Sequence, residues 1–288
     1  VTQLGEAAFG VSDSDLSKGT TTASGIETIS LPALENGTST SYLANRIFEN
    51  CVSLSSVTLS DNLNALSSYM FKGCTALKSI TLPSKLVYMG IYTFQNSGLE
   101  SITIPELVEH LGAKAKTSAT ISASVYLFDG CENLVSVTLP SKLQTIGAYV
   151  FRNCTNLSTI TYTGYTGTDN SLPESVTLVG TYAFSGCTSL EQLSLPGVQT
   201  TGSAAFGAED SKINDGTTVP SGIRNVSLPS LVTAGNYLFQ NCASLESVIL
   251  GDDLVSLSSS MFAGCTALQS IELPESLTTI STSAFKDC

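Results

Sequence analysis

Apolar and polar residues alternate in short runs that recur along the whole chain. In the run Leu77-Lys-Ser-Ile-Thr-Leu82, alternation would place Ile80 and Leu82 on one face of an extended strand and Ser79 and Thr81 on the other. Ten segments follow the form L-x-x-[IVL]-x-L closely, and eight of the nine Pro residues directly follow such a run or one similar to it. Because proline has no N–H to donate to a ladder, each run predicts a short strand with one buried face that ends at proline.

The spacing of Phe and Cys shows that these strands belong to a repeat. All eleven Phe residues occupy one repeating position: Phe9, Phe48, Phe71, Phe94, Phe128, Phe151, Phe184, Phe206, Phe239, Phe262 and Phe285. Five of the ten intervals are 23 residues, one is 22, and the other four (39, 34, 33 and 33) equal this unit plus an insertion. All eight Cys residues lie three positions after one of these Phe residues: Cys51, Cys74, Cys131, Cys154, Cys187, Cys242, Cys265 and Cys288. One coil cannot bury its own apolar face, so the pattern predicts an α/β repeat solenoid, dominated by strands, with Phe closing each coil.

A longer repetition indicates that a block of several coils was duplicated. We expect one array over residues 1–288, with related blocks at about 7–94 and 204–288. Insertions fall at about 10–25, 106–118, 163–172 and 207–222, and insertions in solenoids map to surface loops. The chain begins and ends within a repeat and lacks recognisable polar caps. We therefore expect a segment of a longer array, or end-to-end self-association through exposed strand edges.

The segment Phe71-Lys-Gly-Cys-Thr-Ala-Leu-Lys-Ser-Ile-Thr-Leu-Pro-Ser-Lys-Leu-Val-Tyr-Met-Gly-Ile-Tyr-Thr-Phe94 resembles the repeat of the BspA-like, or Treponema-type, leucine-rich-repeat proteins. The resemblance covers essentially the whole chain outside the four insertions. It implies a right-handed superhelix with a parallel β-sheet on the concave face. It also implies a secreted or cell-surface protein that adheres to matrix proteins or to other cells. It provides no site residue to carry over.

Charge and composition exclude several kinds of partner. The net charge is −12, with only 12 Lys and Arg residues, which disfavours nucleic acid and anionic membrane surfaces. No apolar stretch approaches the roughly 18 residues of a spanning helix, and the N-terminus carries no signal-peptide pattern. The spacing of the cysteines matches no zinc motif, and stacked side chains point in parallel, so we expect a ladder of buried free thiols.

The residues that could perform catalysis are few and scattered. His110 is the only histidine, and we predict that it lies in a solvated loop, within the insertion that follows Glu106. Five acidic residues lie in the two insertions that precede strands: Asp13, Asp15, Glu209, Asp210 and Asp215. Their spacing is not that of an EF-hand, so we interpret them as solvated, turn-forming residues rather than calcium ligands. We predict no cofactor and no metal site, and we regard an enzyme as the remote alternative.

The candidate binding surface consists of tyrosines. The outward strand positions are nearly all Ser or Thr, whereas protein hot spots favour Trp, Tyr and Arg. Six tyrosines precede a repeat Phe by two residues, and two more lie at an insertion; together they are Tyr69, Tyr92, Tyr126, Tyr149, Tyr182, Tyr237, Tyr162 and Tyr165. The six either form an exposed stripe or pack over the Phe column with wet hydroxyls.

Two classes of function follow from these features. The first is a non-enzymatic surface or secreted module for binding or adhesion, with a protein or glycan of a host or cell surface as its partner. The second is a structural spacer, a rigid stalk that displays other domains. Extracellular location is an expectation from the resemblance.

Overall fold

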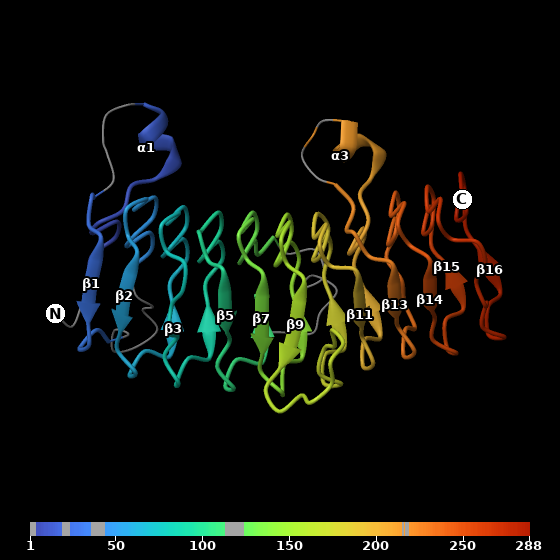
Figure 1. The fold of residues 1–288 in the computed structure, drawn as a ribbon, viewed down its shortest axis with the longest axis horizontal. Helices are drawn as coiled ribbons and strands as arrows, with labels where there is room; N and C mark the ends of the chain where they lie inside the picture. The colour runs from blue at the N-terminus through green and yellow to red at the C-terminus, as the bar shows by residue number, and fades with distance from the viewer. Residues whose placement is uncertain (1–3, 19–23, 36–43, 113–123, 215, 217–218) are drawn as a thin grey trace.

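The chain folds into a row of stacked coils that runs from the N-terminus at one end to the C-terminus at the other (Figure 1). This computed structural model describes residues 4–18, 24–35, 44–112, 124–214, 216 and 219–288. Each regular coil descends through one strand, turns at proline, rises through a two-residue strand and closes through a Phe-containing turn. The repeat solenoid predicted from the spacing of Phe is therefore confirmed.

The front face is formed by the strands that the L-x-x-[IVL]-x-L runs predict. These front strands are β1 (Thr28–Leu31), β2 (Ser56–Leu59), β5 (Ser101–Thr103), β7 (Ser136–Leu139), β9 (Thr159–Tyr162), β11 (Gln192–Ser194), β13 (Asn225–Ser227) and β14 (Ser247–Ile249). All pairs are parallel and grouped as β1–β2, β5–β7–β9 and β11–β13–β14. The register aligns inward residues, as in Val137 opposite Ile160, so that the apolar side chains form continuous columns.

The back face carries the shorter strands. They are β3 (Ala65–Leu66), β4 (Tyr88–Met89), β6 (His110–Leu111), β8 (Thr145–Ile146), β10 (Leu178–Val179), β12 (Thr200–Thr201), β15 (Ser256–Leu257) and β16 (Thr279–Ile280). Two five-residue helices, α1 (Asp13–Ser17) and α3 (Asp210–Asn214), project from the same edge of the solenoid (Figure 1). The duplicated blocks therefore carry equivalent helical insertions.

The Phe residues form the central column of the core. Successive rings lie parallel, with centroids 5.3–5.6 Å apart, from Phe9 to Phe285. The nine rings between these two ends are fully buried. The backbone joins the coils at the same place, because each Phe N–H from Phe9 to Phe262 donates to a carbonyl of the next coil, as Phe71 does to Thr93 at 2.8 Å.

The cysteines form a second column beside the Phe residues. All eight are free thiols, and each Sγ donates to the backbone oxygen of the Phe one coil earlier, as Cys74 does to Phe48 at 3.1 Å. Seven of the eight are buried, the exception being Cys288. The predicted thiol ladder is thus present, and each thiol adds a second hydrogen bond to a carbonyl that also accepts a backbone N–H, as Phe48 O does from Cys51 N at 3.1 Å.

Two predicted front strands do not pair. Residues 79–82 and 270–273 have the same alternating sequence as the others, yet among the described residues their backbone groups make no hydrogen bond. The two segments occupy equivalent coils of the duplicated blocks, after Phe71 and Phe262. Nothing in their sequences explains the breaks.

Two insertions are shorter than the sequence indicated. Residues 106–112 follow the ordinary coil, with β6 paired to β8, so the extra residues of that interval fall at 113–123, outside the described part. His110 therefore lies in a back strand rather than in a loop, and its Nδ1 lies 3.0 Å from Thr145 Oγ1. The prediction of a loop histidine is wrong, because residues 106–112 belong to the regular coil, whereas the insertion was predicted to begin at about 106.

The insertion after β9 returns to the front face before residue 172. Asn170 accepts a backbone hydrogen bond from Ser194, and its side chain accepts from Ile160 N and donates to Ser158 O, both at 2.8 Å. The Asn170 side-chain amide thus makes the hydrogen bonds that a neighbouring strand would make with β9, while its backbone carbonyl accepts from β11. Only residues 163–169 form a surface loop, which leaves the solenoid at the edge opposite α1 and α3 (Figure 1).

Candidate binding surfaces

Five of the predicted tyrosines form a continuous stack along the Phe-containing turns of successive coils. The ring centroids of Tyr69, Tyr92, Tyr126, Tyr149 and Tyr182 lie 4.8, 4.8, 4.4 and 5.4 Å apart, and we call this set the tyrosine ladder. Four of the rings are half-buried and Tyr182 is buried. Because each face is covered by its neighbour, the edges and hydroxyls of the rings are what reach solvent.

The local backbone explains why the ladder is regular. In all eleven coils the residue two positions before Phe has a left-handed conformation, with φ between 49° and 64°. This conformation is uncommon for non-glycine residues and costs roughly 1–2 kcal/mol. It recurs because the turn must place the N–H groups of this residue and of Phe toward the next coil. Identical backbone geometry in successive coils brings identical side chains into register.

Cations flank the ladder. The Arg46 guanidinium lies 4.1 Å from the centroid of Tyr69, and that of Arg152 lies 5.2 and 5.1 Å from Tyr126 and Tyr149. Arg152 also forms a two-pronged ion pair with the nearly buried Asp129, at 2.7 and 3.1 Å. Arginine is therefore held in a fixed position against the rings, a geometry that favours cation–π attraction.

The ladder ends where alanine replaces tyrosine. Ala204 occupies the equivalent position of the following coil, and Tyr237, one coil further, has no ring contact with Tyr182 among the described residues. The Tyr182 hydroxyl instead donates to Glu209 at 2.7 Å. Glu209 directly precedes α3, so the α3 insertion contacts the last tyrosine of the ladder. Burial, and then this hydrogen bond, raise the pKa of Tyr182 well above its usual value.

The other two predicted tyrosines lie elsewhere. Tyr162 ends β9, and Tyr165 follows in the loop with its ring 4.7 Å from that of Tyr162. The Tyr165 hydroxyl donates to Asp169 at 2.5 Å. Of the eight tyrosines named from the sequence, five therefore form the ladder, two lie at the loop after β9, and Tyr237 lies beyond the end of the ladder.

Two of the acidic residues in the helical insertions, Asp13 and Asp210, bind side chains of neighbouring coils. Asp13 is paired with Lys72 and accepts a hydrogen bond from Asn50 at 2.9 Å. Asp210 occupies the equivalent place in the second block and accepts from Asn241 at 2.9 Å. The prediction that these acidic residues are solvated turn residues did not include the contacts that Asp13 and Asp210 make between coils. Asp215 lies outside the described residues.

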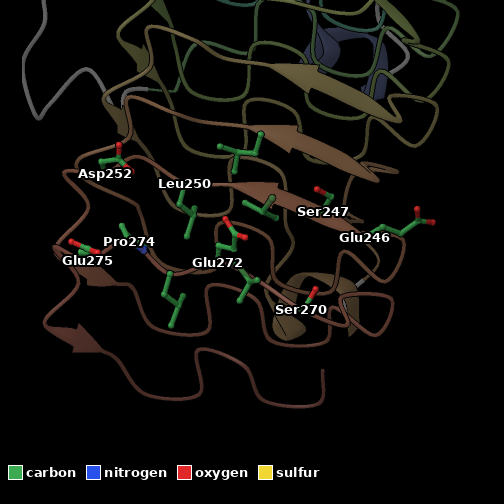
Figure 2. Close-up of a pocket in the computed structure, with 12 residues that line it drawn as sticks. Glu246, Ser247, Leu250, Asp252, Ser270, Glu272, Pro274 and Glu275 are labelled. Atoms are coloured by element: carbon green, nitrogen blue, oxygen red, sulfur yellow. The ribbon is translucent and has the colours of Figure 1, made fainter.

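A hollow opens on the front face where the sheet breaks near the C-terminus. It has a volume of about 920 Å³ and lies between β14 and residues 270–275 (Figure 2). Its walls carry the carboxylates of Glu246, Asp252, Glu272 and Glu275, and Glu272 lies near its middle (Figure 2). Sequence reasoning missed this hollow because the run at 270–273 has the same pattern as paired strands.

The cysteine thiols and the possible metal-ligating side chains bear on whether the described residues could perform catalysis. Burial raises the pKa of the Cys51 thiol to about 11 and that of Cys131 to about 12, which suppresses the nucleophilic thiolate. Among the described residues no group of three or more His, Cys, Asp or Glu side chains is arranged to hold a metal ion. In the same part of the chain, no helix is long and apolar enough to span a membrane.

Comparison with known proteins identifies the family. The model of the BspA type leucine-rich repeat region matches residues 24–120, 116–214 and 212–288, so the chain belongs to this family of leucine-rich-repeat proteins. It is similar to the crystal structure of a leucine-rich repeat protein from Bacteroides ovatus, with 24% identity, a TM-score of 0.54, and coverage of 100% of this chain and 80% of that one. It is also similar to the pneumococcal vaccine antigen PcpA, with 20% identity, a TM-score of 0.52, and coverage of 90% and 67% respectively. No curated protein is similar enough to count as a relative.

Proposed function

We propose that this chain is a non-enzymatic binding module of a secreted or cell-surface protein, and that it contacts a partner protein through the tyrosine ladder. The observation that carries the proposal is the stack of five tyrosines with Arg46 and Arg152 fixed against it. Tyrosine and arginine are, with tryptophan, the residues enriched at the hot spots of protein–protein interfaces. Family membership supports the module's role, and PcpA, a similar structure, is a vaccine antigen.

The geometry favours a protein over a sugar as the partner. A sugar ring stacks on an aromatic face, and within the ladder these faces cover one another. The exposed edges and hydroxyls suit hydrogen bonds and packing against a protein surface. The ladder also needs no rearrangement to bind, because its rings are already stacked, which lowers the entropy lost on association.

The test is a binding screen against matrix proteins, glycans and whole cells. The variant Tyr92→Phe/Tyr126→Phe/Tyr149→Phe keeps the stacked rings and removes three hydroxyls, while Tyr165→Ala changes a tyrosine at the opposite edge as the control. We expect the triple variant to lose about tenfold or more in affinity for the captured partner, since each lost hydrogen bond costs about 0.5–1.5 kcal/mol. The control should bind like the unchanged chain.

Two outcomes would contradict the proposal. Equal binding by the triple variant would move the site away from the ladder. Binding to no protein or cell by the unchanged chain would favour the spacer, in which the array only displays other domains.

A further inference from the structure

The break between β14 and residues 270–273 is a gap in an otherwise hydrogen-bonded sheet. The backbone groups of residues 270–273 make no hydrogen bond among the described residues. β14 pairs with β13 on one side only, so its other edge also faces the gap. Behind the gap the coils remain joined, because Phe262 N donates to Ala284 at 2.8 Å and β15 pairs with β16. The front of these coils is therefore open while the back is held.

Unpaired strand edges are the groups that an extended peptide binds. A peptide added as a strand satisfies main-chain N–H and C=O groups, and its alternate side chains fill adjacent pockets. The hollow here has a volume within the range of ordinary ligand sites. Exposed Ile249 and Leu273, 56% and 42% accessible, flank it on its two walls. Ile249 is also an exception on a front face whose other outward strand positions are nearly all polar.

Charge decides which peptide would fit. Residues 1–152 hold 12 acidic and 9 basic residues, whereas residues 153–288 hold 12 acidic and only 3 basic residues, a net charge of −9. Asp252, Glu272 and Glu275 have no cationic partner among the described residues, and only Glu246 is paired, with Arg224 at 2.5 Å. Such a surface attracts a cationic segment and repels an acidic one.

We propose that this gap binds an extended, lysine- or arginine-rich segment of a partner protein, which adds as a strand between β14 and residues 270–273. The surface is distinct from the tyrosine ladder, so this inference stands or falls independently of the proposed function. Apolar side chains of the segment would contact Ile249 and Leu273, and alternate basic side chains would face Glu272 and Glu275.

The test uses a fluorescein-labelled peptide of alternating Lys and Val, measured by fluorescence anisotropy with the whole chain. Two comparison peptides replace Lys by Glu, or replace alternate Val by Pro to remove main-chain N–H donors. The variant Glu272→Gln/Glu275→Gln neutralises the middle and one wall of the gap. Asp61→Asn/Glu132→Gln makes the same charge change at two exposed sites in the first half of the chain.

We expect the Lys–Val peptide to bind, and to bind about fivefold or more weakly to Glu272→Gln/Glu275→Gln, because two ion pairs are lost. The control variant should lose less than twofold, and both comparison peptides should bind at least fivefold more weakly. Absence of Lys–Val binding, or an equal loss in both variants, would overturn the site. Equal binding of the Pro-containing peptide would overturn strand addition. Thermal unfolding monitored by circular dichroism will verify that each variant is folded.

Discussion

Removing one central ring of the Phe column is the sharpest test of how the solenoid is held together. Phe151 is fully buried, and it stacks on Phe128 at 5.5 Å and on Phe184 at 5.6 Å. The substitution Phe151→Ala removes the apolar contact of the whole ring and leaves a cavity between two coils. Such substitutions cost about 3–5 kcal/mol, and we expect a value in the upper half of this range because both ring faces lose a partner.

A matched control lies at the end of the same column. Phe285 is only partly buried and stacks on one ring, Phe262, at 5.3 Å. We expect Phe285→Ala to cost about half as much as Phe151→Ala, since roughly half of the contacts are lost.

The assay is urea unfolding at 25 °C followed by circular dichroism, with the slope of the transition compared between variants. Repeat arrays can separate into independently unfolding parts, and a changed slope for Phe151→Ala would reveal this. A loss below about 1 kcal/mol for Phe151→Ala, or equal losses for the two variants, would refute the view that the Phe column is the continuous core.

Three further predictions concern the turns, the helical insertion and the thiols. Gly73 has φ +71°, and an added Cβ would lie 2.1 Å from Asn50 Oδ1, so Gly73→Ala should lower the free energy of unfolding by about 1–2 kcal/mol or more. Gly164 has a similar φ, and an added Cβ there would lie in open space, so Gly164→Ala measures the backbone strain alone. A larger loss of unfolding free energy for Gly164→Ala than for Gly73→Ala would contradict the clash at Gly73. The hydrogen bond from Lys72, followed by that from Asn50, holds the pKa of Asp13 below its usual value despite partial burial. The resulting stabilisation is present above about pH 4 and is lost as pH falls through the lowered pKa, so the stability advantage over Lys72→Met should shrink in acid denaturation curves. Native alkylation at pH 8 should modify mainly the one exposed cysteine, and mass spectrometry after denaturation should count eight modified thiols.

The sequence determined the repeat, its core and its thiol ladder because these depend on which way each side chain faces within a single coil. Alternation over six residues places Ile80 inward and Ser79 outward. The fixed three-residue step from Phe to Cys places both residues in the same turn in eight of the eleven coils. The tyrosines were also visible, since they precede Phe by two residues. Their order as a ladder follows from a left-handed backbone that recurs in each coil.

Only the tertiary structure decided what happens between coils. Hydrogen bonds between front strands join residues more than 20 positions apart, so the alternation within 79–82 or 270–273 does not reveal whether those strands pair. The same holds for His110, whose strand is defined by its partner Thr145, and for Asn170, whose side chain replaces a backbone partner of β9. Local patterns specify the faces of a strand, whereas register, breaks and the hollow that they create depend on the relative position of two coils.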